Sequence, residues 1–432
     1  MNDIDIRAFR LNKCLAKVLK GFKPPENITV SEWADKYRVL SGNAEPGPWR
    51  TARTPYLKEP MNSFNDPMVN RIIVVACSQV GKSELELNII GYVIDVEPDT
   101  IVFLQPTVNN AKKFSKLRIN QLIRDCKKLK NKIRADKSKD SNNTVLEKSF
   151  PGGMLIMVGT NAPGDLASTP ARIVLADERD RHARSAGKEG DPFQLARARQ
   201  TTFKKRYKSV EVSSPTVVGD SRIADSFYEG TQEYWCHQCP ECKNWHVIEF
   251  KDIRFDYEEI KNSNTKEPTY KVDLKGWACP SCGIISSEYE MKKQPQKWVA
   301  KNPDAYKDGV RSFWIKGFAN TWADWSEICL KFLQCKKDPY KLQVFMNTVL
   351  GELWEDRGDI ETEDVYLNRR EEYSTDLPDG VLCLTCGVDT QDDRLEYEVV
   401  GHGRYKEDWG IHKGFILGRP DDPETWKQLD DV

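Results

Sequence analysis

The sequence predicts an α/β fold built around a doubly wound parallel sheet. Strand-like and helical patterns alternate from residue 71 to about residue 225, as they do in sheets whose strands are joined by helical crossovers. Two continuous apolar runs, at 71–76 and 172–176, are typical of strands buried on both faces. Each run ends in a short polar motif.

The first motif is a loop that ends in Gly-Lys-Ser at 81–83 and leads directly into a helical pattern at 84–96. Backbone N–H groups of such a loop cradle a triphosphate, the lysine meets the β and γ oxygens, and the hydroxyl binds Mg²⁺. Ala76 occupies the place of the usual first glycine, so the motif is a variant; a chance Gly-Lys-Ser after a buried strand is the alternative. The predicted nucleotide-binding residues of this loop are Ser78, Gln79, Val80, Gly81, Lys82 and Ser83.

The second motif is the adjacent pair Asp177 and Glu178 at the end of the 172–176 run. Asp177 is expected to hold Mg²⁺ through water and Glu178 to polarise the water that attacks the γ-phosphate. A solvated turn is the alternative. Because the glutamate directly follows the aspartate, we expect an ASCE-type P-loop ATPase with an extra strand between the two motif strands. Residues 154–159 or 100–105 are the candidates for that strand.

Two further segments are candidates for nucleotide contacts. A strand at 209–213 ends in polar residues, of which Ser214 and Thr216 are predicted to sense the γ-phosphate as in helicase-like motors; an ordinary strand-ending turn is the alternative. Tyr56 follows a proline upstream of the loop and could stack on the adenine, although a packed core tyrosine would give the same pattern.

Composition limits the possible partners and compartment. The 432 residues suffice for two or three domains, and the net charge of −1 means that any grip on DNA comes from local patches. Basic patches lie at 112–139 and 197–208, each of which could also be a solvated face. No apolar run reaches the roughly 18–20 residues that span a bilayer, and no signal-peptide core is visible. We expect a cytosolic protein whose twelve cysteines stay reduced.

Two Cys-Pro-x-Cys pairs predict a structural zinc site. Four thiolates presented by two tight turns make a closed tetrahedral site, and the long gap between the pairs implies an inserted hairpin. Buried free thiols are the alternative to a zinc site. Cys236 and His237 are second-choice zinc ligands, after the four cysteines of the two pairs. Cys383 and Cys386, which have the same spacing, are expected to be buried in a strand. The predicted ligands are Cys239, Cys242, Cys279 and Cys282.

A strand carrying Asp389, followed by a turn and an alternating strand, is how an RNase H-like nuclease begins. Asp389 would be one ligand of a two-metal site, whereas a single strand aspartate taken alone is usually structural. The sequence stops soon afterwards, so we expect a truncated nuclease that cuts DNA weakly or not at all. Glu396 and Glu398 share a strand face and could lend one further ligand.

The expected organisation has five parts. They are an N-terminal region with an early amphipathic helix and the adenine-side segment (1–70), a P-loop ATPase core (71–226), a zinc-binding ribbon-like segment (227–298), a helical connector (299–380) and the beginning of the nuclease domain (381–432).

Together these motifs, in this order, resemble the large terminase subunit of tailed double-stranded DNA phages, in its lambda-type GpA family. The resemblance covers almost the whole chain. Its motifs are 28–35, 46–51, 54–56 and 78–83, then 159–161, 166–168, 177–178 and 189–192 with Leu195, Ala196 and Arg199, and finally 213–216, the two cysteine pairs and 387–389. Many terminases carry Arg or Lys at the position of Ser78, so here that charge must come from elsewhere.

The resemblance implies an ATP-driven motor that pumps double-stranded DNA into a procapsid, coupled to an endonuclease that cuts concatemers. It implies ATP, Mg²⁺ (or Mn²⁺ in the nuclease) and Zn²⁺ as cofactors. The implied partners are a small terminase subunit, the portal protein and further copies in a ring, in the host cytoplasm, transiently docked on the procapsid. The rivals are a P-loop helicase or DNA remodeller, and a non-enzymatic zinc-ribbon scaffold that binds DNA or protein.

Overall fold

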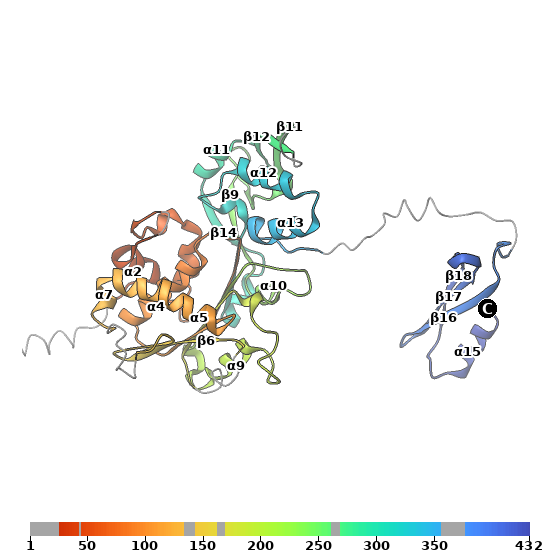
Figure 1. Ribbon diagram of the computed structural model, residues 1–432, viewed down its shortest axis with the longest axis horizontal. Helices are drawn as coiled ribbons and strands as arrows, with labels where there is room; N and C mark the ends of the chain where they lie inside the picture. Colours follow the sequence, from red (N-terminus) through yellow and green to blue (C-terminus); the bar gives the residue numbers. More distant parts are fainter. Residues whose placement is uncertain (1–25, 43–44, 134–142, 162–168, 261–267, 356–375) are drawn as a thin grey trace, which may run out of the picture. The chain divides into compact units, whose positions relative to one another are not determined.

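The computed structural model describes residues 26–42, 45–133, 143–161, 169–260, 268–355 and 376–432. The chain divides into two compact units, residues 1–356 and 357–432 (Figure 1). The expected helix near the chain start, the end of the 112–139 patch and the 166–168 motif lie outside the described residues. None of the described helices is long and apolar enough to cross a membrane.

The first unit begins with a small helical layer. Thr29 and Glu32 form a capping box that starts α2 (Val30–Tyr37). Trp33 of this helix is fully buried and lies against Gly91, where a Cβ would sit 2.2 Å from its ring. The layer continues through β1 (Val39–Leu40), β2 (Gly47–Pro48), η1 (Thr51–Arg53), η2 (Pro55–Leu57) and α3 (Lys58–Asn62).

A ten-stranded sheet forms the centre of this unit, in the order β10-β9-β15-β3-β8-β7-β4-β6-β5, with β14 also paired to β9. All neighbours from β9 to β6 are parallel, and β10, β14 and β5 are antiparallel. This confirms the expected α/β fold. The strands are β3 (Arg71–Ala76), β4 (Ile101–Gln105), β5 (Glu147–Phe150), β6 (Gly153–Gly159), β7 (Ile173–Asp177), β8 (Lys208–Ser213), β9 (Glu233–Gln238), β10 (Trp245–His246), β14 (Gln296–Ala300) and β15 (Val310–Ile315).

The strand between β3 and β7 is β8. An inserted strand was expected there, but neither candidate occupies the place, because β4 and β6 both lie on the far side of β7. The central strands are all buried on both faces, so their apolar patterns are too alike to reveal their order.

Helices cover both faces of the sheet (Figure 1). Ile72 and Val74 of β3 belong to the core on one face, whereas Ile73 and Val75 pack with Phe227 on the other. The first face carries α4 (Lys82–Asp95), α5 (Val108–Phe114), the π-helical turn η3 (Ser115–Ile119), α6 (Asn120–Asp125) and α7 (Lys127–Lys130). The second face is covered by α9 (Pro192–Ala198) and α10 (Arg222–Glu229). Two short helical turns, η4 (Arg179–Arg181) and η5 (Thr201–Arg206), lie in the connection between β7 and β8.

The expected domain boundaries at 226 and 298 fall inside this sheet. β9 and β14 come from the expected zinc segment, and β15, from the expected helical connector, is the parallel neighbour of β3. The pairing joins strands far apart in sequence, which local patterns do not reveal. The compact unit instead continues to residue 356.

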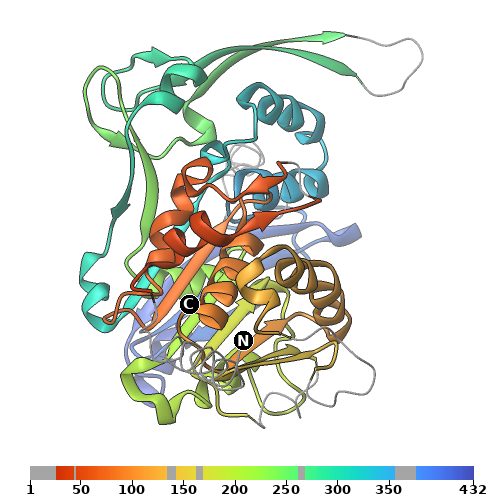
Figure 2. The same cartoon turned by 90° about the vertical axis from the view of Figure 1, so that its left-hand side faces the viewer.

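The cysteine-rich segment contains the expected hairpin. β11 (Ile253–Ile260) and β12 (Thr269–Ala278) project from the body in Figure 2, and β13 (Ile285–Ser286) completes a three-stranded sheet. Trp277 and Trp325 are fully buried in the core shared by this sheet and the following helices. The remaining elements are η6 (Phe250–Asp252), α11 (Glu288–Lys293), η7 (Pro303–Asp308), η8 (Gly317–Ala319), α12 (Trp325–Cys335), α13 (Pro339–Val344) and the π-helical η9 (Phe345–Leu350).

The second unit is an antiparallel three-stranded sheet, β16 (Cys383–Thr390), β17 (Arg394–His402) and β18 (Asp408–Leu417), with η10 (Arg404–Lys406) and α15 (Pro423–Asp430). Its small core contains Leu395, Tyr397 and Ile416. Cys383 and Cys386 are exposed, contrary to the expected burial, because β16 is an edge strand of this unit and most of its side chains are uncovered.

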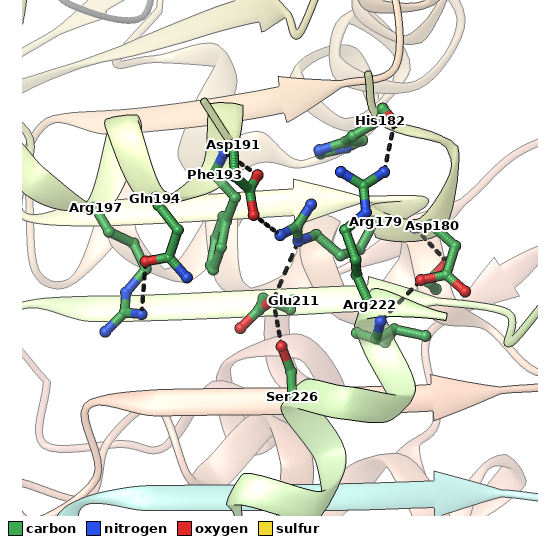
Figure 3. Close-up of polar contacts among 12 residues, drawn as sticks. Arg179, Asp180, His182, Asp191, Phe193, Gln194, Arg197, Glu211, Arg222 and Ser226 are labelled. Carbon is green, nitrogen blue, oxygen red and sulfur yellow. Dashed lines mark hydrogen bonds and ion pairs between the residues drawn. The ribbon is translucent and has the colours of Figure 1, made fainter. Parts of the chain in front are cut away.

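A buried charged network supports the loop after β7 (Figure 3). Glu211 on β8 is 1% exposed; its carboxylate contacts the Arg71 guanidinium at 3.2 Å and the Arg179 guanidinium at 3.4 Å. Ser226 donates to the same carboxylate at 3.1 Å, and Arg179 also donates to Asp191, the N-cap of α9. The network therefore ties β3, β8 and the start of η4 to α9 and α10.

Asp180, the next residue in the loop, connects it to the segment that follows β8. Its carboxylate accepts hydrogen bonds from Thr216 Oγ1 at 2.8 Å, Ser221 Oγ at 2.6 Å and the backbone N–H of Ile223 at 2.8 Å. Its own N–H donates to Ser213 Oγ at 3.2 Å. The loops after β7 and β8 are thus fixed to each other.

Removal of the Glu211 carboxylate should destabilise the first unit strongly. In Glu211→Ala two largely buried guanidiniums lose their shared partner, so we expect the free energy of unfolding to fall by about 3–5 kcal/mol. Glu229→Ala is the matched control, because Glu229 also pairs with Arg71 but is 60% exposed; there we expect less than about 1 kcal/mol. Urea titrations of both variants test this, and equal losses would contradict it.

Candidate nucleotide site and cysteine cluster

The loop between β3 and α4 has the backbone shape of an anion site. Gln79 and Gly81 adopt left-handed conformations, with φ of 62° and 88°, which lets the chain turn sharply from strand to helix. The N–H groups of the first helical turn have no acceptor within the helix. An anion facing them is stabilised by hydrogen bonds and by the helix dipole.

The loop is anchored from behind by the end of the first unit. The N–H of Cys77 donates to Ile315 O at 3.1 Å, and that of Ser78 donates to Thr348 O at 2.7 Å. Gly351 lies so close that a Cβ there would be 2.8 Å from Cys77 N. The backbone N–H of Ser78 therefore already has a hydrogen-bond acceptor within the protein.

Lys82 brings three of the predicted residues together. Its ammonium is 9% exposed and donates to Ser214 Oγ and, at 3.3 Å, to Ala76 O. It also lies 3.9 Å from Glu178 Oε1. Because Lys82, Ser214 and Glu178 come from α4, the end of β8 and the end of β7, the candidate site lies where these elements meet.

Asp177 and Glu178 differ in environment although they are adjacent. Asp177 is 6% exposed and accepts a hydrogen bond from Gln105 Nε2 at 2.9 Å; burial raises its pKa to about 6. Glu178 is 28% exposed and has a left-handed backbone with φ of 52°, a strained conformation that is enriched at functional sites. Its carboxylate lies between two cations, with Oε1 3.9 Å from Lys82 and Oε2 3.6 Å from Arg181.

Three polar residues around Asp177 were not predicted from the sequence. Gln105 ends the neighbouring strand β4. His182 Nε2 lies 2.8 Å from the carbonyl of Asp177, and burial lowers the pKa of His182 to about 3, so its neutral ring donates this bond. The third, Glu86, is fully buried in α4. Burial and the neighbouring Asp177 and Glu178 raise its pKa well above the ordinary value. An acidic residue within an otherwise apolar helical stretch was the available signal for Glu86.

The other predicted nucleotide contacts differ in position. Val80 is buried, whereas Gln79 is exposed and Ser83 is half-buried on the first turn of α4. The hydroxyl of Thr216 donates to Asp180 and not to Lys82. Thr216 therefore links the two loops in this structure.

Tyr56 occupies the core. It is 0% exposed, and its ring lies edge-on to Trp235 with centroids 6.3 Å apart. No face of the ring is open to stack on a base, so the structure supports the packed-core alternative.

The two Cys-Pro-x-Cys pairs meet at one point. The ligand atoms of Cys239, Cys242, Cys279 and Cys282 all lie within 4.8 Å of one another. The two turns match: Cys239 N–H donates to Asn244 O at 2.8 Å and Cys279 N–H to Ile284 O at 2.9 Å. Cys236 and His237 lie on β9 outside this cluster.

Asp389 has one acidic neighbour across the sheet. It is exposed on β16, directly opposite Glu396 of β17, and Gln391 Nε2 lies 3.4 Å from a carboxylate oxygen of each. Arg394 donates to Glu396 at 2.9 Å. Among the residues that the structure describes, only the four cysteines form a group of three or more potential metal ligands.

The basic patches are partly neutralised. In the described part of the first, Arg118 pairs with Glu84 at 3.7 Å and Lys132 with Asp95 at 3.0 Å. In the second, Lys208 is buried and donates to the carbonyls of Asp66 and Val69, and burial lowers its pKa to about 8. Lys208 therefore has a structural role.

Comparison with known proteins gives two family matches. The model of the phage terminase large subunit gpA ATPase domain matches residues 43–298, and that of the terminase large subunit gpA endonuclease domain matches residues 310–432. The terminase large subunits of Enterobacteria phage P21 and Escherichia phage lambda are each 25% identical, over 94% and 100% of this chain.

This chain spans 65% of the length of the P21 protein and 69% of that of the lambda protein. Among solved structures, the HK97 bacteriophage large terminase aligns with 90% of this chain and 68% of its own, with a TM-score of 0.45 and 11% identity. The first family match alone includes more than half of the 432 residues. The chain therefore belongs to the GpA family of phage terminase large subunits.

Proposed function

We propose that this chain is an ATP-hydrolysing motor that translocates double-stranded DNA into a viral procapsid, coupled to endonucleolytic cutting of concatemeric DNA, with weak or no cutting by these 432 residues alone. The observation that carries the proposal is the contact of Lys82 with Ser214 and its approach to Glu178, because three motifs far apart in sequence converge there. Membership of the GpA family supplies the substrate class.

The residues fit ATP and Mg²⁺ as an ASCE-type P-loop site. The backbone of residues 79–83 and the Lys82 ammonium would hold the phosphates, and Ser83 and Asp177 would hold Mg²⁺, which neutralises charge on the transferred phosphoryl group. Glu178 would orient and deprotonate the attacking water. Ser214 accepts a hydrogen bond from Lys82 and would exchange that contact for one to a γ-phosphate oxygen.

The cysteine cluster fits a structural Zn²⁺ site. Four thiolates satisfy the tetrahedral coordination of the ion and leave no position for water. The cluster joins the two turns that begin and end the β11–β12 segment, so the ion would fasten the projecting hairpin.

The second unit fits the opening of an RNase H-like nuclease domain. Asp389 would be a ligand of a two-metal site for Mg²⁺ or Mn²⁺, with Glu396 the nearest further carboxylate in the strand register. In the host cytoplasm, docking on the procapsid would bring the chain together with a portal protein, a small terminase subunit and other copies in a ring.

ATP hydrolysis should require both Lys82 and Glu178, for different reasons. Lys82→Ala removes a phosphate contact, so ATP binding and hydrolysis should both fall. Glu178→Gln should lower the hydrolysis rate at least about 100-fold and largely retain binding, because the carboxylate acts on water. Phosphate release with double-stranded DNA and a fluorescent-nucleotide titration measure the two properties.

Glu147→Gln is the control, since this exposed residue lies on the edge strand β5; wild-type rates are expected. Equal loss of ATP affinity in Glu178→Gln and Lys82→Ala would refute the assignment of Glu178. A wild-type chain without DNA-stimulated hydrolysis would instead favour a non-enzymatic scaffold.

The chain should contain one equivalent of zinc. Cys239→Ser should reduce the zinc content and lower the melting temperature, because one of four ligands is lost. Cys236→Ser is the matched control, a buried cysteine nearby in the sequence but outside the cluster, and should keep its zinc. Elemental analysis of protein purified without chelators measures the zinc content. A wild-type protein without zinc would refute the proposed zinc site.

A further inference from the structure

The candidate site contains a third carboxyl group, that of Glu86, for which the roles above give no use. Glu86 lies one helical turn after Lys82, on the same face of α4. Its side chain is 0% exposed. The charged groups that act on its pKa are Asp177, Glu178 and Lys82, and its carboxyl group lies within hydrogen-bonding reach of that of Asp177, so it faces the site.

Neither oxygen of Glu86 accepts a hydrogen bond from an N–H or hydroxyl donor in the described part of the chain, and its side-chain partner is a second acid, Asp177. Other buried carboxylates of the sheet are satisfied: Glu211 has two guanidiniums and a hydroxyl, and Asp177 has the amide of Gln105. Burying two carboxyl groups against each other without a donor group between them is costly. An unsatisfied group of this kind in a native protein calls for a missing water molecule or ion.

The surroundings of Glu86 select a hydrated divalent cation. Two other carboxylates face the same region, and the hydroxyl of Ser83 lies on the preceding helical turn. Hard oxygen ligands suit Mg²⁺, which retains several of its water molecules in proteins. Such water molecules are the donors that the Glu86 oxygens lack.

We propose that Glu86 positions the divalent cation of the nucleotide site, with its carboxylate accepting a hydrogen bond from a metal-bound water molecule beside Asp177. This inference rests on the proposed ATPase function. Glu86 would not coordinate the metal itself but would hold one of its water molecules. Mutation of such supporting residues typically lowers metal affinity 10- to 100-fold.

The proposal predicts opposite effects on metal affinity and on stability. Glu86→Gln keeps the shape and supplies an N–H donor toward Asp177 and Glu178, so the nucleotide-free protein should melt at the same or a higher temperature than wild type. The same change should weaken metal binding about 10- to 100-fold. A residue with a purely structural role would show the reverse: a lower melting temperature and unchanged metal affinity.

Mn²⁺ is the probe, titrated into the full chain with saturating ADP and followed by electron paramagnetic resonance. Glu84→Gln is the control, since Glu84 lies on the same helix but pairs with Arg38 and Arg118; wild-type Mn²⁺ affinity is expected. Glu86→Asp, which keeps the charge, should retain more of the affinity than Glu86→Gln and provides a second test if the latter does not fold.

Wild-type Mn²⁺ affinity in Glu86→Gln, or equal losses in Glu86→Gln and Glu84→Gln, would overturn the proposal and leave the ATPase function intact. A wild-type chain that binds ADP but no Mn²⁺ would overturn it as well. Failure of the proposed function itself is distinguishable, because the wild-type chain would then bind neither ADP nor Mn²⁺.

Discussion

The candidate site depends on the parallel pairing of β3, β8 and β7. Parallel strands place all their carboxyl ends at one edge, and these three neighbours deliver the 77–81 loop, Ser214 and the Asp177–Glu178 pair to the same place. Reversing one of these strands would send its motif to the opposite edge, and exchanging two of them would change which motifs are neighbours. The interaction between Lys82 and Ser214 exists only because β8 lies between the other two strands.

The buried charged groups of the sheet form two sets, one in which acidic and basic groups are paired and one in which acidic groups face one another. The Arg71–Glu211–Arg179 network has charges of both signs in contact, and it fixes the loop that carries Glu178. At the carboxyl edge, Glu86, Asp177 and Glu178 face the ammonium of Lys82, and Arg181 also pairs with Glu178 at 3.6 Å. Burial and the crowding of three acidic groups at that edge raise the pKa of Glu86 and Asp177. This crowding is complementary to a divalent cation, whereas the acid of the Arg71–Glu211–Arg179 network is already paired.

Local motifs were predictable from the sequence because each consists of neighbouring residues. Lys82 lies at the start of the helix after the first motif loop, Asp177 and Glu178 lie at the end of β7, and the four cysteines meet at one point, as expected. Features set by distant contacts were not: β8 was missed as the inserted strand, and β15 was placed in a connector although it pairs with β3. Tyr56 was ambiguous because burial against Trp235 depends on β9, which lies much later in the chain.

The pairing of β15 with β3 has a consequence for the order in which the protein can form during synthesis. β3 is made early, but one of its two neighbours, and the carbonyls of Ile315 and Thr348 that anchor Cys77 and Ser78, are made only after the whole cysteine-rich segment. Contacts of such long sequence separation form slowly, since a long loop must close first. A nascent chain on the ribosome therefore holds an incomplete candidate site until the end of the first unit has emerged, so a ligand of that site can bind only after the sheet is closed.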